Sequence, residues 1–208
     1  LLLDMKSPGV TVQPIRTFDG TGIEINQVFF DNVRVPVSQR IGPEGDGWRI
    51  AKELLAAERF GNAEVSRSLA SLGRLRQFCR REHSGGRRLM DDPHVSRRLA
   101  ELHVALRAVE RTELRFLMHG GDALGAEAAL LKLRGTEVQN DILSAAADLL
   151  GPAVAYDTGD LDGPGVPVAA PPEVRHALRS HFNYRKTMIY GGSSEVQRNI
   201  LVKAVLQL

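Results

Sequence analysis

The stretch that decides the fold at the end of the chain is Met188-Ile189-Tyr190-Gly191-Gly192-Ser193-Ser194-Glu195-Val196-Gln197-Arg198-Asn199-Ile200. Two glycines interrupt the chain just before a helix, and Ser194 and Gln197 have the S-x-x-Q spacing of a capping box. Backbone N–H groups at such a helix N-terminus attract phosphate or other anions. On the residues alone, a well-capped last helix that binds nothing is the simpler alternative. The residues that follow predict one apolar helical face: Val196, Ile200, Leu201, Ala204 and Val205.

The composition is that of a soluble globular protein, because 43% of the 208 residues are hydrophobic and 25% are charged. The net charge of +2 is too small to indicate a nucleic-acid-binding protein. A single cysteine, Cys79, excludes an internal disulfide and fits a reducing compartment. The composition and the lack of a signal peptide predict a bacterial cytoplasmic location. The first residues, Leu1 to Met5, lack an initiator methionine and read as the middle of a strand. The sequence is therefore expected to be a piece of a longer chain.

Residues 1–47 have a β-like pattern. Short runs of β-branched and aromatic residues at 10–15, 23–25, 28–30 and 33–35 are separated by Gly, Pro and Asn. This pattern predicts a small antiparallel sheet that is too short to close a barrel by itself.

From Trp48 onward the pattern is helical. One apolar stripe predicts a first helix that begins at Trp48 and ends near Gly85-Gly86. Further helices are predicted from Pro93 to 120, from 123 to 150, from 172 to 189 and from Ser194, with a surface loop at 157–172. The expected fold class is mainly α: an antiparallel up-and-down helical bundle at 48–208, preceded by a partial antiparallel β-domain at 1–47. The stripe consists of Ile50, Leu54, Ala57, Gly61, Val65, Leu69 and Leu72.

The run from Ile189 to Ile200 resembles the C-terminal signature of the acyl-CoA dehydrogenases. The runs Ser7-Pro8-Gly9-Val10, Phe29 to Pro36 and Ile41 to Trp48 resemble, in the same order, the second half of that family's middle β-domain and its exit into the helical domain. The resemblance implies dehydrogenation of an acyl-CoA substrate with FAD as cofactor and an electron-transfer flavoprotein as acceptor. It also implies a homodimer, a homotetramer, or a heterotetramer with a related subunit.

Glu58 is the candidate catalytic residue. It lies on the apolar stripe of the first predicted helix, where a carboxylate is costly unless it is paired or functional. The alternative is an ion pair with Arg59 or with an arginine of another helix. Most acyl-CoA dehydrogenases carry their base directly after the tyrosine of the signature, where this chain has Gly191. A minority carry it on the first long helix in a Glu-Arg pair, which Glu58-Arg59 matches, so the resemblance implies that Glu58 removes the substrate α-proton.

The resemblance also implies roles for other residues. Tyr190, Gly191 and Arg59 would contact the acyl thioester. The flavin-binding residues would be Gly192, Ser193, Glu195, Arg81 and Gly151.

Two stretches depart from the family pattern. Where the family has Arg-x-x-Phe-Gly, which holds the FAD of the partner subunit, this chain has Glu82-His83-Ser84-Gly85-Gly86, with Arg81 just before it. Where the family has Gln-x-x-Gly-Gly, this chain has Asp148-Leu149-Leu150-Gly151-Pro152. A non-catalytic or FAD-deficient subunit of a heteromeric enzyme is therefore an alternative, and a helical interaction module unrelated to flavins is a third. The histidines form no cluster with metal-ligand spacing, so no metal site is expected.

Overall fold

The computed structural model describes residues 1–19, 24–61, 63–118, 126–151 and 177–207, with the backbone alone at 55–60 and 178. The chain forms two compact units, residues 1–55 and 56–208. The predicted fold class is confirmed, because the described residues form mainly helices with a few short antiparallel strands. The predicted loop at 157–172 lies outside the described residues.

The first unit contains a two-stranded antiparallel ribbon of β1 (Val10–Pro14) and β2 (Asn26–Phe30). Val12 pairs with Val28 at its centre. The ribbon is closed at one end by the backbone N–H of Asp31, which donates to the carbonyl of Gly9 at 2.9 Å. A Cβ at Gly9 would lie 3.2 Å from the carbonyl carbon of Asp31, and the φ of Gly9 is +87°, so this position requires glycine. The runs predicted at 10–15 and 28–30 are thus confirmed as strands.

The run predicted at 23–25 begins outside the described residues, and β2 starts at Asn26 directly after it. Two other strand predictions are wrong. Residues 33–35 form no strand and lead through Pro36 into the short 3-10 helix η1 (Val37–Gln39). Asn32 adopts a left-handed conformation with φ 52°, which turns the chain out of β2, and Pro36 has no N–H to donate to a ladder. Residues 1–4 are likewise irregular, and the N–H of Leu2 donates to the carbonyl of Gln39 at 2.9 Å.

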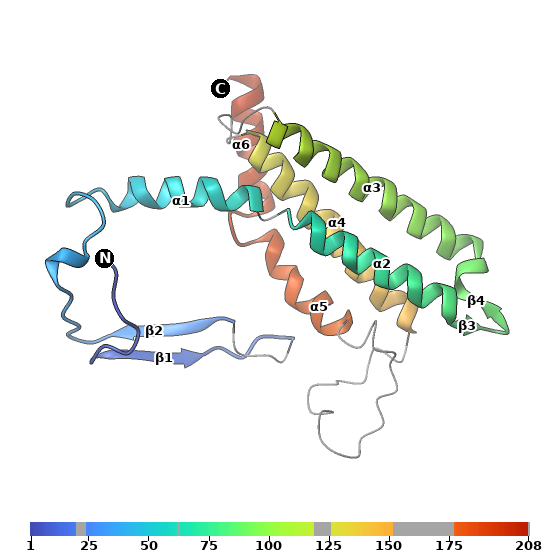
Figure 1. Cartoon of the computed structure of the whole chain (residues 1–208), viewed down its shortest axis with the longest axis horizontal. Helices are drawn as coiled ribbons and strands as arrows, with labels where there is room; N and C mark the ends of the chain where they lie inside the picture. Colours follow the sequence, from blue (N-terminus) through green and yellow to red (C-terminus); the bar gives the residue numbers. More distant parts are fainter. Residues whose placement is uncertain (20–23, 62, 119–125, 152–176, 208) are drawn as a thin grey trace, which may run out of the picture. The chain divides into compact units, whose positions relative to one another are not determined.

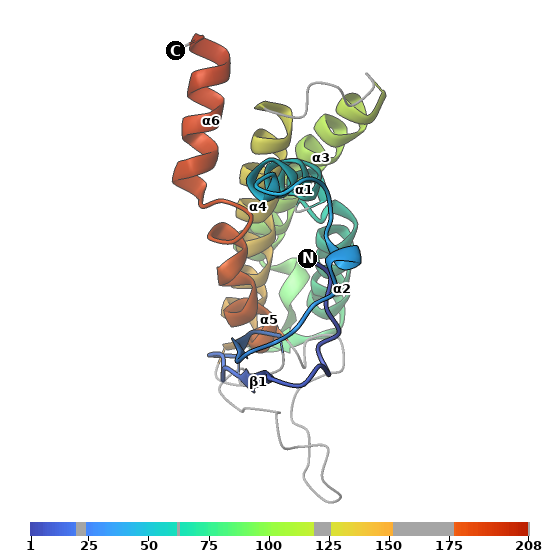
Figure 2. The same ribbon diagram turned by 90° about the vertical axis from the view of Figure 1, so that its left-hand side faces the viewer.

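The second unit is the predicted helical bundle (Figure 1). The bundle contains the long helices α2 (Val65–Arg81), α3 (Pro93–Met118) and α4 (Ala126–Leu150), and each runs antiparallel to the one before it. The segment α5 (Ala177–Asn183), the 3-10 helix η4 (Tyr184–Met188) and α6 (Ser194–Leu206) pack along α4 (Figure 2). Helix α1 (Gly47–Gly61) crosses the boundary between the two units. Within the described ranges, no helix combines the length and the apolar character that a membrane span needs.

The prediction of a single long helix from Trp48 to Gly85 is wrong. The structure divides it into α1 and α2, and Glu64 between them has left-handed backbone angles of φ 42° and ψ 42°. Helix α2 then ends at Arg81, and the chain forms a hairpin of β3 (His83–Ser84) and β4 (Arg87–Arg88) before the 3-10 helix η2 (Leu89–Asp91). The hairpin turn is Gly85-Gly86, with φ values of 58° and 83° that suit a two-residue turn with both residues left-handed. The glycine pair therefore builds a defined hairpin.

Helix α6 does not bury the apolar face that its sequence predicts. Val196 and Val205 are 46% and 71% exposed, whereas the polar side chain of Gln197 is fully buried. The inward position is taken by Gln197 because its amide bonds the carbonyls of the preceding glycine turn.

The apolar core lies between α2, α3 and α4 and encloses Cys79, which has no exposed surface. Burial raises the pKa of the Cys79 thiol to about 11.

The Cys79 thiol should therefore stay protonated and react with iodoacetamide at pH 8 at least about a hundredfold more slowly in the folded protein than in denaturant. Mass spectrometry of the alkylated protein over time checks this, because Cys79 is the single cysteine. Equal labelling rates in native buffer and in denaturant would contradict it.

Candidate active site

The candidate site is built around the turn at residues 190–193. The turn begins where the N–H of Tyr190 donates to the carbonyl of Lys186 at 2.9 Å, at the end of η4. Gly191 and Gly192 then take left-handed φ values of 65° and 90°. A Cβ at Gly192 would clash with the Nε2 atom of Gln197. The backbone path thus requires glycine at position 192.

The N-cap of α6 is Ser193, which corrects the predicted capping box by one residue. The N–H of Val196 donates to the Ser193 hydroxyl at 3.5 Å. The Ser194 hydroxyl instead donates to the carbonyl of Met188 at 3.4 Å. The predicted reciprocal contact fails because the side chain of Gln197 turns toward the glycine carbonyls.

Two fully buried side chains hold the glycine turn. The Nζ atom of Lys132 in α4 donates to the carbonyl of Gly192 at 2.8 Å. The Nε2 atom of Gln197 donates to the carbonyls of Gly191 at 2.9 Å and of Gly192 at 3.3 Å. Both donors are 0% exposed, and burial lowers the pKa of Lys132 while Glu195 acts in the opposite direction. The turn is therefore fixed through its carbonyl groups.

Neither Lys132 nor Gln197 was expected as a site residue from the sequence. The available signal is the composition around Lys132, a lone cation in the run Leu130-Leu131-Lys132-Leu133. Lysine is almost never fully buried unless it is paired, so a lysine in such a run indicates a specific acceptor. The sequence does not say which acceptor.

Glu195 lies in the first turn of α6 and is exposed. Hydrogen bonds from the Ser193 side chain and from its own backbone lower the pKa of Glu195, with smaller contributions from Arg198 and Lys132. Its carboxylate is thus ionised at neutral pH and meets the positive end of the α6 dipole. Glu195 disfavours the phosphate that the sequence pattern alone suggests, and it suits a hydroxyl or N–H donor.

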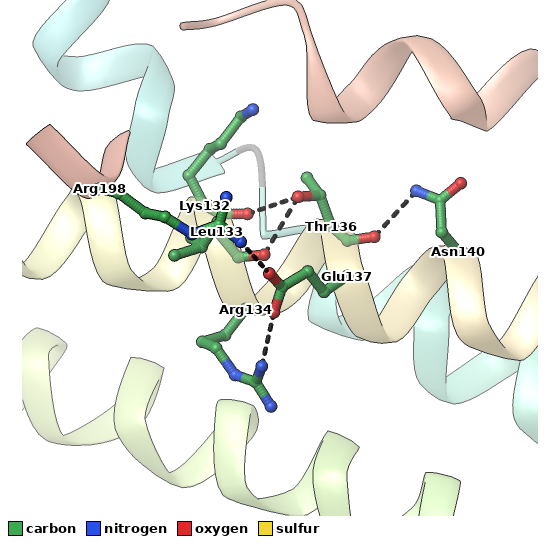
Figure 3. A network of polar contacts seen from close by, with 7 residues as sticks. All are labelled: Lys132, Leu133, Arg134, Thr136, Glu137, Asn140 and Arg198. Atoms are coloured by element: carbon green, nitrogen blue, oxygen red, sulfur yellow. Dashed lines mark hydrogen bonds and ion pairs between the residues drawn. The ribbon is translucent and has the colours of Figure 1, made fainter. Parts of the chain in front are cut away.

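A second polar network joins η4 to α4. Figure 3 shows its α4 side chains, Thr136 and Asn140. The Nδ2 atom of Asn140 donates to the hydroxyl of Thr187 at 3.1 Å and to the carbonyl of Thr136 at 2.9 Å. On the surface, Arg198 of α6 pairs with Glu137 of α4 at 3.2 Å. The surface pair contributes at most about 1 kcal/mol. The buried bonds of Asn140 are therefore the stronger constraint on the segment that leads into the turn.

The structure brings some of the predicted site residues together. The turn and the start of α6 carry Tyr190, which is 39% exposed, and the predicted cofactor residues 192, 193 and 195. Glu58 and Arg59 lie near the end of α1, but their side chains are outside what the structure describes, so their roles remain predictions.

The other two predicted cofactor residues are remote from the turn. Arg81 ends α2 and Gly151 follows α4, and these two helices end on the same side of the bundle (Figure 1). Gly151 is nineteen residues beyond Lys132 along α4, which corresponds to about 28 Å. Within one chain they cannot serve the same small site as the 190–193 turn.

The sequence profile of "Acyl-CoA dehydrogenase, C-terminal domain" matches residues 45–206. The chain therefore belongs to the acyl-CoA dehydrogenase family, which confirms the resemblance in the sequence. It is 30% identical over 212 residues to the acyl-CoA dehydrogenase IpdE1 of Mycobacterium tuberculosis, a match that covers all of this chain and 50% of the relative. It is 26% identical over 213 residues to the mitochondrial short-chain specific acyl-CoA dehydrogenase of Rattus norvegicus, covering 99% of this chain and 47% of the relative.

Solved structures with the same fold include the ChsE4–ChsE5 complex of Mycobacterium tuberculosis. That match has a TM-score of 0.80 and 26% identity, and it covers 100% of this chain and 52% of the matched chain. A glutaryl-coenzyme A dehydrogenase in complex with glutaryl-CoA matches with a TM-score of 0.79 over 99% of this chain and 49% of its own, but at 20% identity it shows the fold alone. The chain spans about half the length of the relatives that it matches.

Proposed function

We propose that this chain supplies part of the active site of a flavin-dependent acyl-CoA dehydrogenase, which forms a double bond between the α- and β-carbons of an acyl-CoA thioester. The observation that carries the proposal is the fixed glycine turn at 190–193, in a chain whose family is established. Gly191 has no side chain, so a thioester can approach the backbone there, and Tyr190 and Arg59 would line the acyl side.

The residues of the turn fit an uncharged part of FAD. The Glu195 carboxylate accepts hydrogen bonds and repels phosphate, while Gly192 and Ser193 offer backbone and hydroxyl contacts. When bound, FAD accepts the hydride that leaves the β-carbon. Arg81 and Gly151, at the far end of the bundle, would instead face a cofactor held mainly by a neighbouring subunit, and an electron-transfer flavoprotein would take the electrons onward.

Glu58 is the proposed general base. It takes the proton from the α-carbon, and the electron pair of that C–H bond becomes the new double bond as the hydride leaves the β-carbon. The position that carries the base in most of the family is Gly191 here, which has no group to accept a proton. The α1 position is therefore the remaining one of the two that the family uses.

A second candidate function is that of a subunit that binds little FAD itself and completes the site of a related partner. The observation that favours it is the β3–β4 hairpin, which occupies the stretch where the family pattern places a phenylalanine and follows the acidic Glu82. A relative at 26% identity was solved as the ChsE4–ChsE5 complex, which is a complex of two named chains.

One experiment separates these functions. The full-length protein is purified alone and after co-expression with a related subunit from the same genome. Flavin absorbance per subunit and turnover of a panel of acyl-CoA thioesters are then measured with an artificial electron acceptor. Flavin and turnover in the protein alone support the first function, and flavin and turnover only in the co-purified pair support the second. Absence of flavin and turnover from both preparations would contradict both functions.

A further inference from the structure

Helix α4 carries a buried polar stripe along one face, which we define as Lys132, Gly135, Thr136, Gln139 and Asn140. The spacing of three, four, seven and eight residues places all five on the same side of the helix. Lys132, Thr136, Gln139 and Asn140 are 0%, 1%, 3% and 4% exposed. Buried polar groups persist in a core when they have specific partners. Thr136 bonds carbonyls of α4 itself, whereas Lys132, Gln139 and Asn140 bond other segments of the chain.

One partner is the junction between α1 and α2. The Nε2 atom of Gln139 donates to the Glu64 carboxylate at 3.0 Å, and Arg67 pairs with the same carboxylate at 3.2 Å. Glu64 holds a left-handed conformation that is disfavoured for residues other than glycine, and its side-chain bonds to Gln139 and Arg67 help to stabilise it.

Next to this bond, Ala63 packs directly on α4. A Cβ at Gly135 would lie 2.6 Å from the Cα atom of Ala63, so the two backbones meet where α4 has no side chain. Ala63 is 1% exposed. The segment that directly follows α1 is therefore fixed on α4 by a close backbone contact and by a hydrogen bond.

Another partner is the glycine turn, which Lys132 holds through the carbonyl of Gly192. Lys132 and Gln139 are seven residues apart on one helix face, or about 10 Å along the axis. In Figure 3, Lys132 and Asn140 extend to one side of α4, and Arg134 extends to the other.

We infer that Lys132 and Gln139 are positioning residues, which set the separation between the glycine turn and the segment that follows Glu58. The inference rests on the proposed function, in which the turn and Glu58 act on the same substrate carbon. Glu58 precedes Ala63 by five residues in the same segment. Helix α4 is rigid and bonds one segment through Lys132 and the other through Gln139, so it fixes the distance between them. Misplacement of a reacting group by about 1 Å can cost about a hundredfold in rate.

The test compares Gln139→Leu and Lys132→Met in the full-length enzyme with the matched control Arg134→Gln on the opposite, exposed side of α4. Amide hydrogen exchange is followed by mass spectrometry, together with kcat and KM for an acyl-CoA. We expect Gln139→Leu to speed exchange at 61–66 by about tenfold or more and to leave 189–197 unchanged. Lys132→Met should speed exchange at 189–197 by about tenfold or more and leave 61–66 unchanged. Gln139→Leu and Lys132→Met should each lower kcat by about tenfold or more, with KM changed less than about twofold. Arg134→Gln should have the exchange pattern, kcat and KM of the parent.

Rescue makes the test specific to the Gln139–Glu64 bond. Glu64→Gln keeps an oxygen acceptor for the amide and should retain the parent exchange pattern and kcat. Glu64→Gly suits the left-handed backbone but removes the acceptor, so it should behave like Gln139→Leu. It also replaces that variant if Gln139→Leu does not fold.

Uniform faster exchange across the bundle, or an unchanged kcat with local exchange at 61–66, would overturn the positioning role. If the parent enzyme oxidises no acyl-CoA, the proposed function fails, but the exchange pattern still decides whether α4 holds the two segments.

Discussion

Replacement of Glu58 by glutamine in the full-length enzyme is expected to lower the rate of acyl-CoA dehydrogenation by about a hundredfold to ten-thousandfold. Glutamine has the shape of glutamate but cannot accept the α-proton, and loss of a general base typically has an effect of this size. Affinity for the acyl-CoA should change little, because other groups hold the thioester. Single-turnover reduction of the flavin, measured with saturating substrate, reports the chemical step directly.

The matched control is Glu53→Gln, five residues earlier on α1. Glu53 is exposed and pairs with Arg49 at 2.7 Å, so its loss should leave turnover at the parent level. Transfer of the carboxylate in the double variant Glu58→Gly, Gly191→Glu should restore part of the activity, since both positions would flank the same carbon. Glu58→Gln with parent turnover and a lower melting temperature would identify Glu58 as a structural ion pair instead.

Replacement of Gly135 by alanine should destabilise the bundle by about 1–3 kcal/mol, the usual cost of forcing an extra group into a packed core. The new methyl would lie 2.6 Å from the Cα atom and 2.7 Å from the carbonyl oxygen of Ala63. These atoms belong to the backbone, so the junction between α1 and α2 must move to admit it. For a chain of this size the melting temperature should fall by about 2–4 °C for each kcal/mol.

Gly73→Ala provides the opposite expectation in the same bundle. Gly73 lies inside α2, and a Cβ there meets no atom within 4 Å. Alanine should raise stability by about 0.5–1 kcal/mol, because it restricts the unfolded chain and favours the helix. Urea titrations of the two variants against the parent should therefore move the midpoint in opposite directions, and equal shifts would contradict the close contact at Gly135.

Local signals in the sequence predicted much of the helical bundle. Pro93 at the first turn and the glycines around residues 120 and 151 marked the long helices, and α3 and α4 have those bounds within a few residues. The break at Glu64 could not be predicted, because it depends on Ala63 meeting Gly135 and on Gln139, about seventy residues later in the chain. The pair Gly85-Gly86 predicts the end of a helix but not the hairpin that follows it, since two glycines support either structure.

The candidate site was predictable where its residues are contiguous. The stretch from Tyr190 to Glu195 is recognisable as a glycine turn at a helix start, and the structure forms it. The donors that hold the turn were not found, because the contact of Lys132 with Gly192 spans 60 residues and leaves no spacing pattern. The serine that caps α6 was misassigned by one residue, since Ser193 and Ser194 are chemically equivalent in the sequence.

Helix α6 buries a polar side chain and exposes apolar ones, so its surface hydrophobicity and its contribution to folding stability depend on different residues. Its fully buried side chain is the amide of Gln197, while Val202 and Leu206 are 46% and 61% exposed. A polar substitution at Leu206, the more exposed of the two, removes little buried surface, so it lowers surface hydrophobicity and changes the unfolding free energy of the chain little. An apolar substitution at Gln197 should instead destabilise the chain, because it removes the hydrogen bonds to the carbonyls of Gly191 and Gly192. Along this one helix, solubility can therefore be engineered independently of folding.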